Sequence, residues 1–198
     1  MGVRFEPEGH RYFLNDAELP SVTTVLRAVG LLNFGGASDS AMAMGRDRGD
    51  RVHLATELND RGELDESSID FEIAGYLAAW RRFVDEWNFK CHEIEVLLHH
   101  PIYRYAGRAD RFGSARLPGK RVSRDDIVLD IKTGTPQRAT GYQLAAYNAC
   151  LVRAQRKRIG VYLLPDGSYR AQPYDHPGDL SVFLSALCVF NARKECKA

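Results

Sequence analysis

The stretch IVLDIKTG, residues 127–134, decides how this sequence is interpreted, because it sets two charged residues in an apolar strand. Residues two apart in a strand face the same side of the sheet, so Asp130 and Lys132 share one face. A buried carboxylate and a buried ammonium are costly when they are left unpaired. The two side chains therefore either form an internal ion pair or face a cleft that binds a charged ligand. This strand alone favours the ion pair.

The strand predicted just before it, over residues 102–113, carries another carboxylate in the segment GRADRF. Strict alternation places Arg108 and Asp110 on one face of this strand and Ala109 and Arg111 on the other. Either arginine could contact a phosphate or simply be solvated at the surface. The functional interpretation depends on which strand lies beside this one.

If the two strands are neighbours, Asp110, Asp130 and Lys132 converge. Two carboxylates at one place repel each other unless a cation lies between them. Mg²⁺ or Mn²⁺ suits such oxygen ligands, because these ions accept one or two carboxylates together with a substrate phosphate. The sequence therefore predicts a centre that polarises a phosphate and activates water, with Lys132 acting on the water or on developing charge.

Hydrophobic periodicity along the rest of the chain predicts a single α/β (α+β) domain over residues 1–198. A meander of strands followed by a crossover helix implies a mixed central β-sheet flanked by helices, with a helical segment N-terminal to it. Ser21 is the expected N-cap of the first helix. Strands are expected at 90–98, 102–113, 127–133, 158–165 and 168–174, a hairpin at 3–14, and helices at 22–32, 40–59, 71–87, 136–153 and 178–194.

Composition excludes several classes of protein. The hydrophobic fraction of 44% and the charged fraction of 27% are typical of a globular chain, not a disordered one. There is no apolar run of the roughly 20 residues that a membrane span needs, and no secretory signal begins the sequence. We therefore expect a cytoplasmic protein without a membrane partner. The net charge of +1 does not by itself indicate a nucleic-acid partner.

Asp110 of GRAD, with Asp130 and Lys132 of DIKTG, resembles the signature of the PD-(D/E)XK nucleases, and the predicted element order resembles the restriction-endonuclease-like core. The proline of the family name is absent, as it commonly is in RecB-like members. The two aspartates are somewhat far apart for that subgroup. We attribute the extra length to a polar insertion at 114–125, either a DNA-contacting hairpin or a surface loop.

Three further segments resemble the RecB-like, phage-type exonuclease subgroup. GDRVHLATE resembles its helix with a metal-ligating histidine, which maps to His53. EIEVLL resembles the strand that brings a glutamate toward the metal, with Glu95 favoured and Glu93 as the alternative register. QLAAY resembles the motif after the catalytic strand and maps to Gln143 and Tyr147. Ordinary helix packing or polar contacts would also explain these residues if the resemblance were absent.

The resemblance implies a metal-dependent DNA nuclease, an exonuclease of recombination, repair or phage DNA processing that uses Mg²⁺ or Mn²⁺. Its alternative is a catalytically inactive nucleic-acid-binding module on the same fold. Degenerate members are expected to lose an acid or the lysine, and here all are present. The implied catalytic residues are Asp110, Asp130, Lys132 and Glu95, the implied metal ligands His53, Asp110, Asp130 and Ile131, and the implied substrate-binding residues Gln143, Tyr147 and Arg108.

The four cysteines do not match the grouping of an iron–sulfur cluster. Relatives with a cluster have three cysteines close together near the C-terminus, whereas Cys188 and Cys196 have no third nearby. Cys91 and Cys150 fall within predicted core elements. No iron–sulfur cluster is therefore expected.

Overall fold

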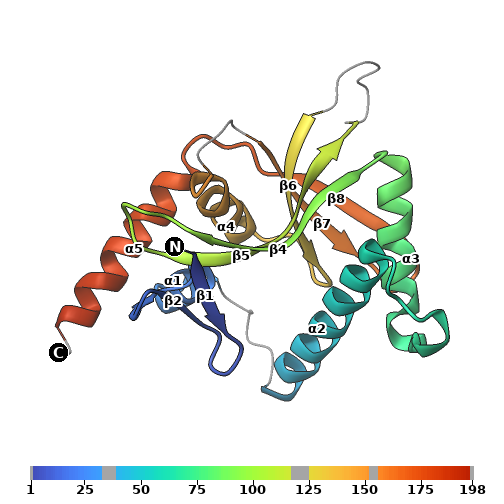
Figure 1. Cartoon of the computed structure of the whole chain (residues 1–198), viewed down its shortest axis with the longest axis horizontal. Helices are drawn as coiled ribbons and strands as arrows, with labels where there is room; N and C mark the ends of the chain where they lie inside the picture. The colour runs from blue at the N-terminus through green and yellow to red at the C-terminus, as the bar shows by residue number, and fades with distance from the viewer. Residues whose placement is uncertain (1, 33–38, 117–124, 152–155, 197–198) are drawn as a thin grey trace.

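A mixed five-stranded sheet with strand order β4-β5-β6-β7-β8 forms the centre of the protein (Figure 1). The computed structural model describes all residues except 1, 33–38, 117–124, 152–155 and 197–198. Only the β6–β7 pair is parallel, and the other three neighbouring pairs are antiparallel. The strands are β4 (Lys90–His99), β5 (Ala106–Ala115), β6 (Asp125–Lys132), β7 (Lys157–Leu163) and β8 (Tyr169–Pro173).

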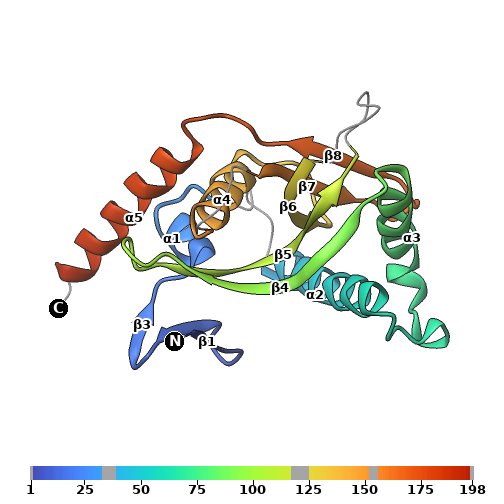
Figure 2. The ribbon, with the colours of Figure 1, turned by 45° about the horizontal axis from the view of Figure 1, so that its top comes forward.

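Helices cover both faces of this sheet, which confirms a mixed sheet flanked by helices. The parallel β6–β7 pair requires a crossover, and α4 supplies it. Figures 1 and 2 show α1, α4 and α5 gathered around one part of the sheet, and α2 and α3 around the other. The helices are α1 (Val22–Ala28), α2 (Asp39–Arg61), α3 (Phe71–Glu86), α4 (Arg138–Ala149) and α5 (Asp179–Glu195), with a 3₁₀ turn at Glu66–Ser68.

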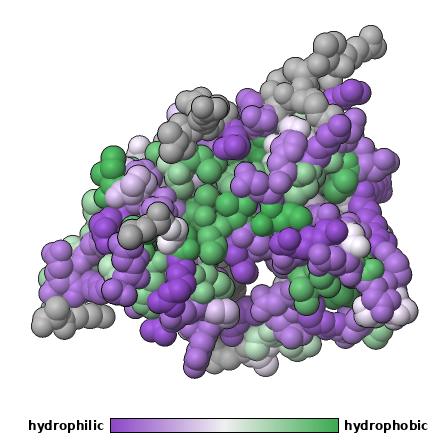
Figure 3. Space-filling view, in the orientation of Figure 1, coloured by the Kyte–Doolittle hydropathy of each residue, from purple (hydrophilic) through white to green (hydrophobic). Residues whose placement is uncertain are grey.

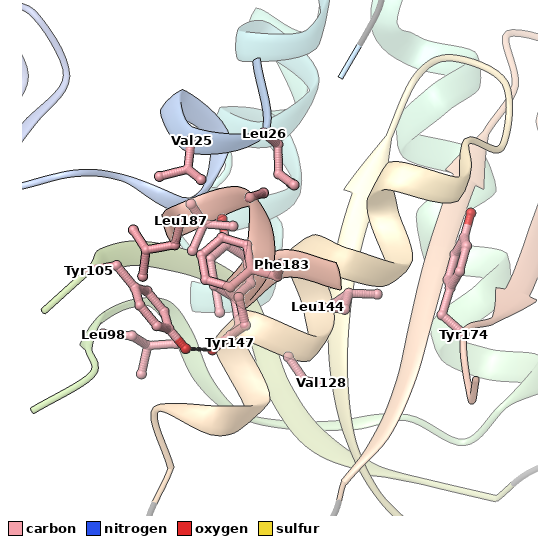
Figure 4. Packing of buried hydrophobic residues seen from close by; sticks show 14 of the residues in the cluster. Val25, Leu26, Leu98, Tyr105, Val128, Leu144, Tyr147, Tyr174, Phe183 and Leu187 are labelled. Carbon is pink, nitrogen blue, oxygen red and sulfur yellow. Dashed lines mark hydrogen bonds between the residues drawn. The ribbon is translucent and has the colours of Figure 1, made fainter. Parts of the chain in front are cut away.

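The alternation predicted for β6 divides the core into two clusters. Val128 packs with residues of α1, α4 and α5, whereas Leu129 and Ile131 pack with residues of α2 and α3. Figure 4 shows the first cluster, where Phe183 of α5 lies against the Tyr105 ring at a centroid distance of 4.8 Å. Because β6 is buried on both faces, its few charged side chains must be compensated inside the protein.

The N-terminal segment forms a second, antiparallel sheet of three strands, where only a hairpin was expected. Its strands are β1 (Val3–Glu6), β2 (Arg11–Leu14) and β3 (Ala17–Leu19). Tyr12 and Leu19 pack on Ala106 at the start of β5, and the Ala106 amide donates to the Pro20 carbonyl at 3.0 Å. These contacts attach the small sheet beside the start of β5. β3 was missed because three residues are too few to show a period.

Several boundaries differ from the sequence expectation; α4, for example, ends at Ala149 and not at residue 153, and two other differences have a visible local cause. β5 begins at Ala106 and not at residue 102, because the chain turns there: the His100 amide donates to the Tyr105 carbonyl at 2.9 Å. α1 ends at Ala28, since Gly30 takes a φ of +80° and the Leu31 and Leu32 amides fold back onto the Leu26 carbonyl.

One expected helix cap is confirmed, whereas most of the expected insertion lies outside the described residues. The Ser21 side chain accepts from the Thr24 amide, so the predicted N-cap is confirmed. Of the predicted insertion at 114–125, residues 117–124 lie outside the described part. Among the described residues, no helix has the length and apolarity needed to cross a membrane.

We expect Gly75→Ala to destabilise the protein, because the close approach of α3 to the end of β7 requires a glycine. A Cβ at Gly75 would lie 1.8 Å from the Pro165 carbonyl oxygen. The expected cost is about 1–3 kcal/mol of unfolding free energy. Gly45→Ala on α2 is the control, since a Cβ there meets nothing within 4 Å. Helix propensity should then stabilise that variant by about 0.5–1 kcal/mol. Urea denaturation measures both, and a stabilised Gly75→Ala variant would contradict this packing.

Candidate metal centre

The candidate centre lies where β5 and β6 cease to pair. Their hydrogen-bonded ladder ends at the pair Arg111–Leu129. One step further, the Asp110 carboxylate accepts a hydrogen bond from the Ile131 amide at 2.6 Å. The Asp110 side chain thus replaces the backbone carbonyl that would accept this hydrogen bond in a regular ladder. The two strands are neighbours, as the convergence of Asp110 with the DIKTG strand required.

The backbone is irregular at this same level. Ala109 packs in the cluster that contains Val128, whereas the Arg111 guanidinium lies over Trp80 on the other face of the sheet. The predicted common face for Ala109 and Arg111 is therefore wrong. Glu95, on β4 between the positions paired with these two residues, has a φ of +52°. Strict alternation fails because the strands are locally distorted around Asp110.

Three side chains from different elements converge at this irregularity. His53 of α2, Glu95 of β4 and Asp110 of β5 each offer a ligand atom, and these atoms lie within 4.8 Å of one another. His53 Nε2 lies 2.9 Å from the Ile131 carbonyl oxygen. A carbonyl only accepts, so Nε2 carries the proton of the neutral ring, and the lone pair is on Nδ1. Nδ1 lies 3.8 Å from Asp110 Oδ2, on the side of the cluster.

Asp130 and Lys132 form a close pair beside this cluster. Asp130 is 1% exposed, and its Oδ2 lies 2.6 Å from Lys132 Nζ. Burial raises the pKa of Asp130 to about 6, although the Lys132 ammonium lowers it. Burial lowers the pKa of Lys132, but the charges of Asp130 and Asp110 raise it above its ordinary value overall. The predicted pair is thus a real contact, and the Lys132 side chain keeps 34% exposure.

Helix α4, which follows β6 in the chain, contacts the buried member of this pair. Gln143 Nε2 donates to Asp130 Oδ1 at 2.9 Å and lies 3.1 Å from the Tyr147 hydroxyl. Tyr147 packs so closely on β5 that a Cβ at Gly107 would lie 2.5 Å from its ring. Gln143 and Tyr147 are both buried. We infer that Gln143 holds the Asp130 carboxylate in place and that Tyr147 in turn holds Gln143.

Two arginines hold the Glu95 carboxylate. Arg108 Nε lies 2.8 Å from Glu95 Oε2, and Arg111 Nη1 lies 3.2 Å from Glu95 Oε1. Burial raises the pKa of Glu95, and the nearby Asp110 charge adds to this, despite the arginines. Glu93 is exposed, so the structure favours the register that brings Glu95 to the centre.

Sequence reasoning missed the role of Arg111, which it left as either a surface or a phosphate-binding residue. Arg111 is fully buried, and its Nε donates to Asp60 Oδ2 at 2.7 Å. Its Nη1 donates to the Asp110 carbonyl at 2.7 Å, and Nη2 to Thr56 Oγ1 at 3.3 Å. One signal could have pointed to it. Thr56 and Asp60 follow His53 by three and seven residues, so all three face one side of α2.

The predicted residues are thus only partly brought together. His53, Asp110 and Glu95 form the cluster of candidate ligands. Asp130 lies next to it, but its oxygens face Gln143 and Lys132, and the Ile131 carbonyl accepts from His53. Ligation by Asp130 or Ile131 stays a prediction. Glu57, which follows His53 by four residues on α2, pairs with Arg61 at 2.9 Å.

Other parts of the described chain offer less for this chemistry. A cavity of about 990 Å³ lies among α4, β7 and β8, but its lining includes none of the predicted site residues. The cysteines lie on β4, at the end of α4, and on and just after α5, and none belongs to the group of candidate metal ligands found among the described residues.

We expect Arg111→Met to cost roughly 3–5 kcal/mol of unfolding free energy, because it leaves the Asp60 carboxylate buried without its cation and removes one of the two arginines that pair with Glu95. Arg108→Met is the matched control. Its side chain is 40% exposed, so the same change should cost less than about 1 kcal/mol. Chemical denaturation of both variants measures the difference. Equal losses would show that Arg111 is no more important to the fold than its exposed neighbour.

The comparisons with protein-family models and with curated proteins identify no relative for this centre. No protein-family model matches the chain, and no curated protein matches it at a significant level. What the centre can do must therefore be inferred from its own side chains and their contacts.

Proposed function

We propose that this protein is a metal-dependent nuclease that hydrolyses DNA phosphodiester bonds on a restriction-endonuclease-like core of the RecB-like PD-(D/E)XK kind. The observation that carries the proposal is the convergence of His53, Glu95 and Asp110, within 4.8 Å, beside a carboxylate–lysine pair. Three separate elements contribute to this cluster.

The donor set fits a divalent cation with a preference for oxygen. Two carboxylates and one imidazole suit Mg²⁺ or Mn²⁺, and the imidazole favours Mn²⁺. The hydrogen bond from His53 Nε2 to the Ile131 carbonyl leaves Nδ1 as the ligating atom and orients the ring. Such an ion, when bound, polarises a phosphate and lowers the pKa of a water molecule.

The remaining side chains would act on the substrate directly or position those that do. Lys132 is proposed to orient the attacking water or to stabilise charge that develops on the phosphate. Asp130 places the ammonium group of Lys132, and Gln143 in turn holds Asp130. Arg108, at 40% exposure, is a cation available to a neighbouring DNA phosphate.

A catalytically inactive DNA-binding module is the second candidate. The observation in its favour is that Asp130 and Lys132 contact each other, as a purely structural ion pair would. The two candidates predict different results when Lys132 is removed. A catalytic lysine affects the rate of cleavage, whereas a purely structural ion pair affects only the stability of the fold.

We expect cleavage of linear DNA to require a divalent cation and to stop in EDTA. Mn²⁺ should support it at least as well as Mg²⁺ because of the imidazole ligand. Labelled single-stranded and double-stranded DNA, incubated with each ion, measures this. Robust cleavage in EDTA would exclude the metal-dependent mechanism.

Variants of Asp110 and Lys132 should distinguish a metal ligand from a residue that acts on the reaction itself. Asp110→Ala should lose both metal binding and cleavage. Lys132→Ala should slow cleavage by about 10²–10⁴-fold while metal still binds, because it removes no ligand. Asp126→Ala, an exposed change on the same strand, is the control and should alter neither. Calorimetric Mn²⁺ titration and single-turnover cleavage measure the two effects.

The inactive-module candidate predicts a different pattern for the same variants. If the pair is only structural, removing Lys132 leaves Asp130 buried and should cost roughly 3–5 kcal/mol. A large fall in the melting temperature of Lys132→Ala, with no metal-induced stabilisation of the wild type, would support that candidate against the enzyme.

We propose that cleavage begins from DNA ends, as in an exonuclease of recombination, repair or phage DNA processing. The described part of the chain is occupied by the core and the small N-terminal sheet, with no separate domain to select an internal sequence. Linear plasmid should be degraded, while the same plasmid as a closed circle should persist. Efficient nicking or linearisation of the circle would contradict the end-dependent mode.

A further inference from the structure

An aromatic cluster on the small N-terminal sheet adjoins the candidate centre. It consists of Phe5, His10 and Tyr12, whose rings contact one another at centroid distances of 4.9–5.4 Å. The Tyr12 hydroxyl lies 3.2 Å from His10 Nε2. Tyr12 is buried, Phe5 is half-buried and His10 is exposed, so the cluster is rooted in the sheet and opens to solvent at the histidine.

Arg108 connects this aromatic cluster to the candidate centre. Its guanidinium carbon lies 5.1 Å from the centroid of the Phe5 ring, while its Nε lies 2.8 Å from Glu95 Oε2. One side chain therefore spans the distance from the aromatic rings to a candidate metal ligand. β1, which carries Phe5, also packs against β4, which carries Glu95.

The surface of the molecule is hollowed at this place. Figure 3 shows a recess between the β1–β2 hairpin and α2, below β4, with hydrophilic residues at its edges. The same elements carry Phe5, His53 and Glu95. A strand of nucleic acid lying in this recess would pass both the aromatic cluster and the candidate ligands.

We propose that the aromatic cluster and Arg108 form a subsite that binds an unpaired base of single-stranded DNA next to the phosphate to be cleaved. This inference rests on the proposed nuclease function and specifies its substrate. Aromatic rings and guanidinium planes stack on the faces of bases, and these faces are free only when the base is unpaired and unstacked. The Arg108 cation complements the phosphate of the same nucleotide.

The opposite face of the same sheet offers a matched control. Phe13 is paired with Arg4 across β1 and β2, and it therefore points away from Phe5 and Tyr12. The guanidinium carbons of Arg4 and Arg11 lie 4.6 and 5.4 Å from its ring centroid. Phe13 thus has an aromatic and basic environment without contact to the candidate centre. Stacking on any aromatic residue of the sheet would involve Phe13 as well, whereas the proposed subsite would not.

The test compares binding of two strands by fluorescence anisotropy in EDTA, so that no cleavage occurs. One strand is oligo-dT, and the other has the same length and phosphates but only abasic sugars. Phe5→Ala and His10→Asn should each weaken oligo-dT binding by about tenfold, with little effect on the abasic strand. Asparagine is chosen because His10 has a φ of +53°, which asparagine tolerates. Phe13→Ala should bind both strands as the wild type does.

Several results would overturn the subsite. Equal losses on oligo-dT and on the abasic strand would mean that the variants act through charge or fold. An effect of Phe13→Ala as large as that of Phe5→Ala would show that binding is not specific to the face of the sheet that carries Phe5. Tighter binding of blunt duplex, or of oligo-rU, than of oligo-dT would exclude unpaired DNA as the preferred ligand. Since His10 is exposed, His10→Asn tests the idea even if Phe5→Ala fails to fold.

The proposed function and the subsite can fail separately. If the wild type binds and cleaves DNA but neither Phe5→Ala nor His10→Asn discriminates between the two strands, the subsite is wrong and the nuclease proposal stands. If the discrimination is present but no divalent cation supports cleavage by the wild type, the stacking subsite stands and the nuclease proposal is wrong.

Discussion

The buried guanidinium of Arg111 is the interaction on which the arrangement of the centre depends. It joins Asp60 of α2 to Glu95 of β4 and to the backbone of Asp110, and it lies over Trp80 of α3. Trp80 in turn donates its indole N–H to Asp60 at 2.8 Å. A cation that is fully buried is tolerated only when its hydrogen bonds and charge are matched, and here four elements supply the matching groups. Arg111 therefore ties α2 and α3 to the sheet, and His53 of α2 lies beside Asp110 in the middle of β5.

A second constraint is the end of the β5–β6 ladder. A regular sheet would pair the Ile131 amide with backbone, leaving no space for side chains between the strands. Because the Asp110 carboxylate takes that amide instead, a carboxylate is placed between two strands and is 8% exposed. The same β6 residue uses its carbonyl to orient His53. The backbone of Ile131 thus positions two of the three candidate ligands. The isoleucine side chain takes no part in these contacts.

The features of the fold and of the candidate centre that depend on neighbouring residues in the sequence could be predicted. The alternation of Asp130 and Lys132, the N-cap at Ser21 and the crossover helix all follow from short-range periodicity or from one residue's chemistry. The face of Arg111 could not be predicted, because it depends on the distortion at Glu95, whose φ of +52° no sequence pattern indicates. Likewise, β3 has three residues and exists only because it pairs with β2.

Charge balance gives a reason for cation binding that is independent of any family motif. Four carboxylates gather around the centre, on Asp60, Glu95, Asp110 and Asp130, against three cations, on Arg108, Arg111 and Lys132. Asp60 and Glu95 pair with the arginines, and Asp130 pairs with the lysine. Of these four carboxylates, Asp110 is the one whose ion pairs within the described ranges include no lysine or arginine, since it pairs with His53. With a neutral imidazole the group therefore carries one excess negative charge, located where the three candidate ligands meet. In a buried setting this charge favours a cation at that point and disfavours an anion, so the proposed binding of a DNA phosphate there would require a metal ion as well.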